Sequence, residues 1–277
     1  MYNRRKFIRE TSCLSMGTFL LPSLLADSKP IDNPGVQLYT VRKEMLADAP
    51  GTLKALAKLG IRQIESAASE KGFYYGLAPK EIKAICTDLG MTLRSGHVGL
   101  DTKWTQTLDQ AAESGQEYLI CSSMPSSGQT VDNYKKVAEA FNKAGEEARQ
   151  RNIKFGYHNH DYEFEKVDGI PLYEVLLKET DPALVHMELD LGWVLASGFD
   201  PLDYFKRFPG RFPLWHLKDM NLQTRQSTEF GKGGLPIKNL FKETSASGMR
   251  YYFIEQEEYS KTPMDALAHN LRYLKKL

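Results

Sequence analysis

Short apolar runs alternate with amphipathic segments along this chain from residue 35 onward. The runs have the length and composition of buried strands, and the segments between them carry apolar residues at helical spacing. We predict strands over residues 36–39, 61–65, 91–95, 118–121, 153–157, 184–189, 212–217 and 251–254. The predicted helices cover residues 53–59, 79–89, 101–114, 131–151, 172–178, 201–208, 237–245 and 264–277. The pattern therefore predicts eight successive strand–helix units.

This alternation predicts a closed barrel of parallel strands. Gly60, Gly90 and Gly115 each follow a predicted helix, where a residue in the left-handed conformation ends many helices. Eight strand–helix units in about 240 residues are typical of the (β/α)₈ TIM barrel. An open, doubly wound sheet is disfavoured, because no glycine-rich phosphate loop follows the first strand. We expect one barrel domain over residues 34–277.

The first 33 residues have a different character and are expected to lie outside the barrel. Residues 3–9 are basic and contain the pair Arg4 and Arg5, and a moderately apolar stretch covers residues 14–25. The segment resembles a twin-arginine export signal. Its apolar stretch is too short to span a bilayer as an ordinary helix. We therefore expect export to the periplasm without stable insertion into the membrane.

Composition excludes several classes of protein. The chain has 277 residues, of which 42% are hydrophobic and 26% are charged, so one large core is available. The formal net charge of +1 gives no bulk attraction to nucleic acid or to an anionic membrane. Three cysteines do not form a disulfide framework in a chain of this length. The composition does not indicate an oligomeric state.

Side chains that bind metals stand at the ends of the last predicted strands. Asp190, His216 and Glu255 each follow an apolar run, and His158 directly follows the fifth predicted strand. In a barrel of parallel strands these ends face the same mouth, so the four side chains converge. Mixed carboxylate and imidazole ligands suit Mn²⁺, Mg²⁺, Co²⁺ or Zn²⁺, and Mn²⁺ is the leading candidate. For each residue alone, a hydrogen-bonded polar cap is the alternative.

Further polar residues around this mouth are candidates for binding a substrate. The set comprises Glu65, His97, His160, Glu163, Trp193 and Glu257. Glu65 and His97 end the second and third strands, and Trp193 could stack on the face of a sugar ring. For His160 and Glu163, the alternative to substrate binding is that they orient the other residues of the site. For Trp193, the alternative is ordinary packing.

Lys218 is a candidate catalytic cation. It follows His216 by two residues and could neutralise negative charge on an oxygen of the substrate. Asp219 could orient either of these two side chains. A solvated lysine at the rim of the barrel is the alternative for Lys218.

Several segments together resemble the xylose-isomerase-like barrel superfamily, and within it the exported sugar phosphate isomerase/epimerase proteins of Bacteroidetes type. The segments are residues 35–42, 157–164, 189–193, 216–219 and 255–257. The superfamily includes ketose 3-epimerases, inosose dehydratases and endonuclease IV. In the ketose epimerases, strands five to eight supply Glu, Asp, His and Glu to the metal, and the two glutamates also act as acid and base.

Asp190, His216 and Glu255 match this pattern, whereas His158 stands where the epimerases have a glutamate. The resemblance implies a divalent-metal-dependent isomerase or epimerase of a sugar or keto-sugar that works through an enediolate, with Glu255 or His158 moving the proton. Because of the histidine, dehydration and the β-elimination of a 3-keto-glycoside are alternatives.

Two other functions are disfavoured. A nuclease like endonuclease IV requires more histidines than the six present and a basic face for DNA. A non-catalytic carbohydrate-binding barrel has no need of the complete set of Asp190, His216 and Glu255. The expected partner is a small carbohydrate, without nucleic acid.

Overall fold

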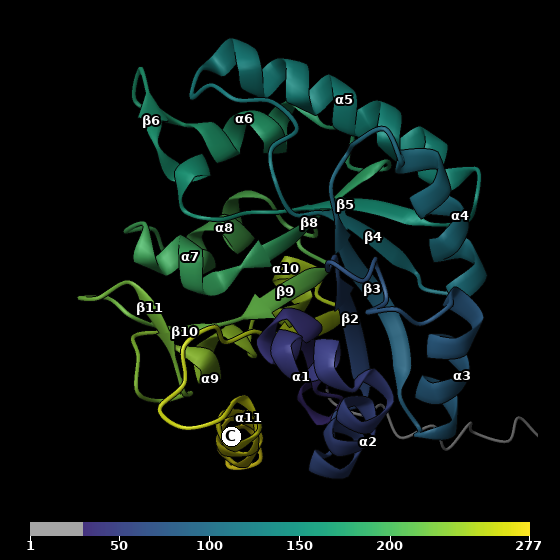
Figure 1. Ribbon diagram of the computed structural model, residues 1–277. Helices are drawn as coiled ribbons and strands as arrows, with labels where there is room; N and C mark the ends of the chain where they lie inside the picture. Colours follow the sequence, from purple (N-terminus) through teal and green to yellow (C-terminus); the bar gives the residue numbers. More distant parts are fainter. Residues whose placement is uncertain (1–29) are drawn as a thin grey trace, which may run out of the picture.

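Eight parallel strands close into a barrel in the computed structural model, which describes residues 30–277 (Figure 1). Strand β1 pairs with both β2 and β12, and this pairing closes the sheet. The strands are β1 (Gly35–Gln37), β2 (Gln63–Ala67), β3 (Thr92–Val98), β4 (Tyr118–Cys121), β5 (Lys154–His158), β8 (Val185–Asp190), β9 (Leu214–Leu217) and β12 (Tyr251–Ile254). The predicted TIM barrel is confirmed. The expected export signal lies, up to residue 29, outside the described residues.

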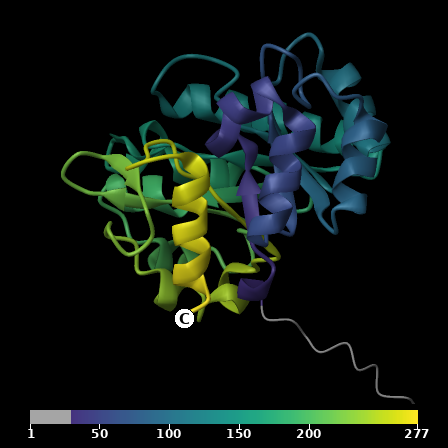
Figure 2. The same cartoon turned by 60° about the horizontal axis from the view of Figure 1, so that its bottom comes forward.

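Helices surround the barrel and connect successive strands (Figure 2). They are α2 (Ala49–Leu59), α3 (Pro79–Asp88), α4 (Trp104–Ser114), α5 (Val131–Arg149), α6 (Leu172–Glu179), α8 (Pro201–Arg207), α9 (Ile237–Leu240), α10 (Thr244–Ser247) and α11 (Pro263–Leu274). Gly60 and Gly115 end α2 and α4 with φ of 106° and 73°, a left-handed conformation that side chains with a Cβ rarely adopt. The glycines that the pattern picked out therefore end these helices.

The first strand is shorter than predicted. It ends at Gln37, and Tyr39 lies in a 3₁₀ helix, η2 (Leu38–Val41), which leads into α1 (Arg42–Ala47). The side chain of Gln37 accepts a hydrogen bond from the backbone N–H of Tyr39 and so caps this turn. The turn moves Tyr39 from the sheet to the barrel mouth.

Several short elements that the pattern did not predict lie at the same mouth of the barrel. They are α7 (Leu191–Ala196), η3 (Tyr162–Phe164) and two small hairpins, β6 (Lys166–Val167) with β7 (Ile170–Pro171) and β10 (Asp219–Asn221) with β11 (Gln226–Thr228). At the other end of the barrel, η1 (Pro30–Asp32) packs through Ile31, whose carbonyl accepts a hydrogen bond from Tyr252.

The strands separate apolar from polar side chains by their period of two. In β8, Met187 and Leu189 join the large core between the sheet and the helices, while Glu188 and Asp190 point to the other face, into the barrel. A smaller apolar cluster of Tyr118, Ile120, Leu214 and Phe253 fills part of the interior. No helix among residues 30–277 is long and apolar enough to cross a membrane.

Candidate metal centre

Four side chains from four strands converge inside the mouth of the barrel. His158 ends β5, Asp190 ends β8, His216 lies in β9, and Glu255 directly follows β12. One donor atom of each lies within 4.8 Å of the others, and all four residues are buried. His216 Nδ1 is 2.9 Å from Glu255 Oε2 and 4.0 Å from Asp190 Oδ2. The structure thus brings together the four residues that the sequence predicted as ligands.

The donor set fits a divalent ion. His158 Nδ1 is buried and has no hydrogen-bond partner. Asp190 Oδ2 is also buried without a hydrogen bond and has only an ion pair with Lys218, at 3.2 Å, so each of the two atoms keeps a free lone pair. Burial, together with the neighbouring His216 and His97, lowers the pKa of His158 well below its usual value. The imidazole of His158 is therefore neutral, which is the form that binds metals. Two carboxylates and two imidazoles could hold an ion here.

Lys218 is buried inside the barrel mouth. Its Nζ lies 2.8 Å from Glu255 Oε2, 2.9 Å from Glu257 Oε1 and 3.2 Å from Asp190 Oδ2. Burial opposes the charged form, but the surrounding carboxylates, Asp190 first, raise the pKa of Lys218 well above its usual value. The ring of Trp193 lies 5.1 Å from the same ammonium group. Lys218 is therefore a fixed cation within the site and not a solvated lysine at the rim.

His216 contacts carboxylates through both of its ring nitrogens. While Nδ1 faces Glu255, Nε2 lies 2.5 Å from Glu65 Oε1 and 3.2 Å from Glu188 Oε2. Gln37 donates to the same oxygen of Glu65 at 2.9 Å. Burial disfavours the imidazolium, but Glu188, Glu255 and Glu65 raise the pKa of His216 well above its usual value. The second proton on this ring supplies positive charge among the clustered carboxylates, and a bound metal ion would displace it.

Glu188 belongs to the buried cluster but is absent from the site residues that the sequence predicted. It is fully buried, it precedes Asp190 by two residues on the inner face of β8, and its Oε2 lies 2.6 Å from His97 Nε2. Burial and the nearby Glu65 raise the pKa of Glu188 well above its usual value. The period of two along β8 is the signal that identifies it, because a glutamate on the face of Asp190 must point into the barrel.

A cavity of about 430 Å³ opens above these residues. The predicted site residues that line it are His97, His158, His160, Trp193, Lys218, Glu255 and Glu257, together with Tyr39. Glu65 and Glu163 are fully buried and are not among the lining residues.

Glu163 holds the loop that follows β5. It accepts hydrogen bonds from the Tyr157 hydroxyl and, at 3.0 Å, from the backbone N–H of His160. Burial raises the pKa of Glu163 to about 8. Its contacts orient the segment that carries His158 and His160.

Asp219 does not orient Lys218 or His216, and that expectation is corrected. Its carboxylate accepts hydrogen bonds from the backbone N–H groups of Gly231, Gly233 and Leu235 at 2.9–3.0 Å. Asp219 begins β10, outside the barrel wall, so its side chain points to the glycine-rich segment. It anchors that loop beside the site.

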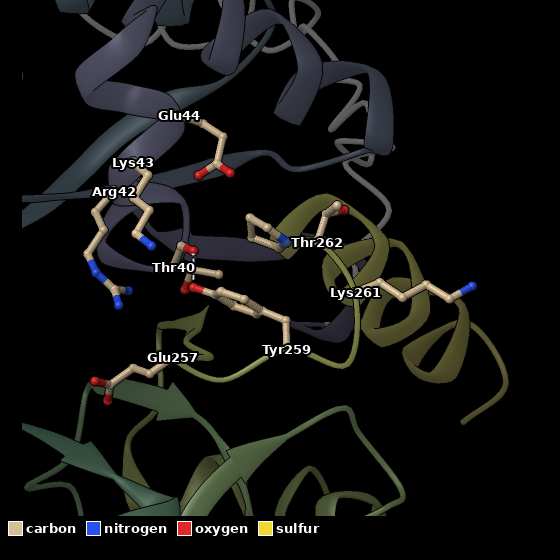
Figure 3. Close-up of a pocket in the computed structure, with 9 residues that line it drawn as sticks. Thr40, Arg42, Lys43, Glu44, Glu257, Tyr259, Lys261 and Thr262 are labelled. Carbon is tan, nitrogen blue, oxygen red and sulfur yellow. Dashed lines mark hydrogen bonds between the residues drawn. The ribbon is translucent and has the colours of Figure 1, made fainter.

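A second cavity of about 430 Å³ adjoins the first at the rim (Figure 3). Glu257 lines both cavities. Arg42 and Lys43 from α1 and Lys261 from the loop after β12 surround the rim cavity, and Tyr259 donates a hydrogen bond to the carbonyl of Thr40 within it. The mouth therefore has room beyond the buried cluster.

Comparison with known proteins agrees with this architecture. A family model described as the xylose isomerase-like TIM barrel matches residues 53–277. The inosose dehydratase of Clostridium tetani is 26% identical over 168 residues, which cover 52% of this chain and 55% of that protein. The inosose dehydratase of Lacticaseibacillus casei is 31% identical over 94 residues, 34% of this chain and 31% of that protein. This chain thus matches about half of the length of the first of these relatives and about a third of the second.

Among solved structures, a sugar phosphate isomerase/epimerase from Parabacteroides distasonis superposes with a TM-score of 0.79 and 28% identity. The superposition covers 90% of this chain and 94% of that one. The likeness therefore extends over nearly the whole barrel.

Proposed function

The chain belongs to the xylose isomerase-like TIM barrel family, and on that premise we propose that it catalyses a metal-dependent elimination from a keto-cyclitol or keto-sugar. In this reaction a proton leaves the carbon beside the carbonyl, and an oxygen leaving group departs from the next carbon. The observation that carries the proposal is the buried pair of Glu255 and Lys218, whose charged atoms are 2.8 Å apart at the wall of the cavity.

Glu255 is the proposed base. Burial opposes its ionisation, but Lys218 and His216 hold the pKa of Glu255 well below its usual range, so the residue is present as the carboxylate, the form that can act as a base. A divalent ion held by His158, Asp190, His216 and Glu255 would polarise the carbonyl and stabilise the negative charge that develops on its oxygen.

A single group, Glu255, can carry out both proton transfers of the elimination. Glu255 takes the proton from carbon, the electron pair forms the carbon–carbon double bond, and the bond from the next carbon to oxygen breaks. The same proton then passes to the leaving oxygen, so the products are an unsaturated ketone and water. Lys218 keeps Glu255 ionised between turnovers, and Trp193 covers one side of the cavity.

The asymmetry of the site favours elimination over epimerisation. Epimerisation by two bases needs proton-transfer groups of similar strength on opposite faces of the substrate. Here Glu255 is a carboxylate paired with an ammonium group, whereas His158 offers a neutral imidazole in place of a second carboxylate. The inosose dehydratases among the relatives carry out a dehydration by name, which supports the same choice.

Isomerisation or epimerisation through the same enediolate is the second candidate. The likeness to the Parabacteroides distasonis sugar phosphate isomerase/epimerase supports it. In that reaction His158 or His160 would return the proton that Glu255 removes, and no bond to oxygen would break. Mn²⁺ is the proposed ion in both cases.

The decisive experiment is NMR of inosose and of a 3-keto-glucoside, each incubated in D₂O with the Mn²⁺-loaded protein. Elimination predicts an unsaturated ketone together with released water or alcohol. Deuterium entry without release of a leaving group would instead establish enolisation, the step of an isomerase. If the Mn²⁺-loaded protein causes neither elimination nor deuterium entry with any keto substrate tested, the proposal is wrong.

The rim cavity suggests a test of substrate size. Arg42, Lys43 and Lys261 surround a space that adjoins the site through Glu257. A glycoside whose leaving group is a sugar could place that group there, whereas an inosose would leave the cavity empty. Lys43→Ala should therefore raise KM for a 3-keto-disaccharide and leave KM for an inosose unchanged.

We further propose that the protein is exported through the twin-arginine motif. Replacing both Arg4 and Arg5 with lysine should retain the protein in the cytoplasm, as measured by cell fractionation. Equal periplasmic amounts of the parent and the variant would contradict the proposal.

A further inference from the structure

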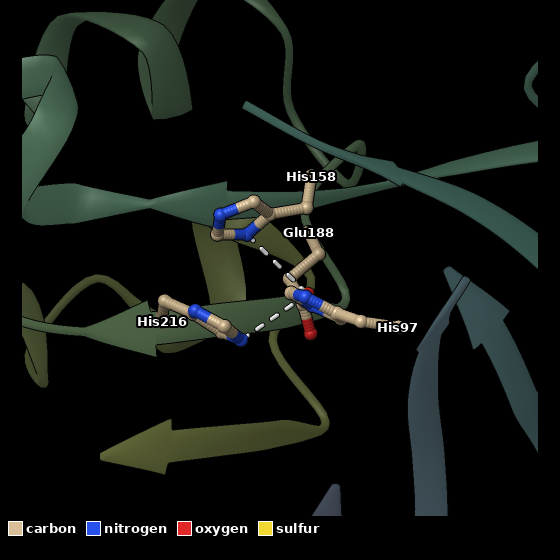
Figure 4. A group of neighbouring side chains, drawn as sticks. All are labelled: His97, His158, Glu188 and His216. Atoms are coloured by element: carbon tan, nitrogen blue, oxygen red, sulfur yellow. Dashed lines mark hydrogen bonds and ion pairs between the residues drawn. The ribbon is translucent and has the colours of Figure 1, made fainter. Parts of the chain in front are cut away.

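A second group of ligand atoms surrounds Glu188, which precedes Asp190 by two residues on β8 and so lies deeper in the barrel than that ligand of the proposed metal centre. Glu188 Oε2 is 2.6 Å from His97 Nε2, 3.2 Å from His216 Nε2 and 3.5 Å from His158 Nδ1. Figure 4 shows the three imidazole rings directed at this one carboxylate. One donor atom from each of the four residues lies within 4.8 Å of the others. The residues come from four strands of the barrel, β3, β5, β8 and β9, which hold them on a rigid wall.

The spacing of these atoms suits a four-coordinate ion. Bonds of about 2.0–2.1 Å to nitrogen and oxygen place the ligand atoms of a tetrahedral ion about 3.3 Å apart. The three distances from Glu188 Oε2 bracket this value. Glu188 Oε1 and His158 Nδ1 are buried without a hydrogen-bond partner, so the protein leaves two potential ligand atoms of this group unsatisfied.

The two groups differ in chemistry. The group with Asp190 and Glu255 offers two carboxylates and two imidazoles, and it suits Mn²⁺ or Mg²⁺. The deeper group offers three imidazoles and one carboxylate, a set that favours Zn²⁺ or Co²⁺. His158 and His216 belong to both groups. A neutral imidazole has one lone pair to give, so the two groups cannot both be filled in the same way.

We propose that the barrel has two alternative metal positions, and that Zn²⁺ and Co²⁺ occupy the deeper one, bound by His97, His158, Glu188 and His216. An ion there has four protein ligands and no open position for a substrate, which is the arrangement of a structural zinc site. By taking His158 and His216, it also empties the position beside Asp190 and Glu255. Zn²⁺ therefore competes with Mn²⁺ and blocks the proposed reaction.

The inference goes beyond the proposed function, although it shares two ligands with it, and it is tested without any substrate. The metal-free protein is loaded with one equivalent of Zn²⁺ or of Mn²⁺, and each ion is located by anomalous X-ray diffraction. We expect Zn²⁺ between His97 and Glu188, and Mn²⁺ between Asp190 and Glu255. A zinc peak between Asp190 and Glu255 overturns the inference and leaves the proposed function intact. If Mn²⁺ does not bind at Asp190 and Glu255, the proposed function is contradicted, whereas the inference of a deeper zinc site is unaffected.

Variants separate the two positions in solution. Glu188→Gln removes a ligand from the deeper position only, and it should weaken Zn²⁺ binding by roughly 10–100-fold or more and Mn²⁺ binding by much less. Asp190→Asn is the matched control and should weaken Mn²⁺ binding much more than Zn²⁺ binding. If Glu188→Gln loses affinity for Zn²⁺ and Mn²⁺ equally, the inference is contradicted. If that variant does not fold, the visible spectrum of the Co²⁺-loaded parent decides, since intense tetrahedral bands are expected and weak octahedral bands would overturn it.

Discussion

The ammonium nitrogen of Lys218 lies 2.8 Å from Oε2 of Glu255, and both side chains are buried. A buried pair of this kind stabilises the ionised form of each partner, whereas removal of one leaves the other charged and unpaired. The pair therefore fixes the protonation state of the proposed base. Its loss should affect catalysis more than binding of the substrate.

Glu255→Gln should lower kcat about 100- to 10,000-fold, because the variant lacks the group that accepts the proton from carbon. Lys218→Met should also lower kcat, since Glu255 then loses its cation and binds a proton more tightly. The measurement is the rate of enone formation from the keto substrate, with Mn²⁺ occupancy checked for each variant.

Glu117 and Lys154 provide the matched controls. They form an ion pair of 2.7 Å at the opposite end of the barrel, where β4 and β5 begin. Glu117→Gln and Lys154→Met make the same chemical changes without touching the site. If these variants lose as much kcat as those at Glu255 and Lys218, the assigned roles are wrong.

Stability should depend on the protonation of Glu163. Its pKa of about 8 in the folded protein exceeds that of an unfolded glutamate, so the folded state binds this proton more tightly. The contribution to stability is fully present below the unfolded pKa of about 4.3 and declines as the pH rises toward 8, by up to about 1.4 kcal/mol per pH unit for one proton.

Glu163→Gln should reduce this decline, because the amide imitates the protonated carboxyl. Its oxygen can accept from the His160 N–H, and its NH₂ group can donate to the Tyr157 oxygen. The measurement is the urea midpoint between pH 5 and 8. Glu139→Gln on the exposed face of α5 is the control and should keep the parent's slope. An unchanged slope in Glu163→Gln would argue against a raised pKa.

The fold could be predicted because it depends on local patterns. The alternation of apolar runs with helical stripes specified the barrel, and Gly60 and Gly115 end α2 and α4 as expected. The predicted first strand continued too far, since the turn at Tyr39 depends on a side-chain cap from Gln37. The small hairpins at the mouth lack a periodic signal of their own, because their strands contain only two or three residues.

The site could be predicted only in part. Asp190, His216 and Glu255 stand at strand ends, where position alone indicates convergence. Glu188 was missed because it lies within an apolar run, and its partners come from other strands. The burial of Lys218 was equally hidden, since it results from carboxylates on β8 and in the segment after β12. Individual contacts between side chains of distant segments, unlike the position of a residue at a strand end, have no signature in a single sequence.

Removal of the metal should destabilise the protein. A ligand that binds only the folded state stabilises it by about 2.7 kcal/mol at one hundred times its dissociation constant. Mn²⁺ should therefore raise the melting temperature of the metal-free protein, and a chelator should reverse the change. Asp190→Asn should abolish the shift, because the amide keeps the hydrogen bond from the Trp193 N–H but lacks the charge. Asp132→Asn, on the exposed side of α5, should retain it.

Gly192 links the backbone of α7 to Lys218. A Cβ at this position would lie 2.4 Å from the carbonyl oxygen of Lys218 and 2.8 Å from Cγ of Met220, so Gly192→Ala must push the strand end away. We expect a loss of about 1–3 kcal/mol in the free energy of unfolding, measured by urea denaturation. Mn²⁺ affinity should fall as well, because α7 begins directly after Asp190.

Gly145 in α5 is the matched control, because a Cβ there would lie 2.5 Å from the carbonyl oxygen of Leu184, before β8 begins and far from the mouth. Gly145→Ala should cost similar stability and leave Mn²⁺ affinity unchanged. Equal effects of the two variants on Mn²⁺ affinity would mean that general loosening of the barrel, and not the displacement of Lys218, controls the site. A selective effect of Gly192→Ala would tie the geometry of the metal centre to the close approach of α7 to Lys218, directly after β9.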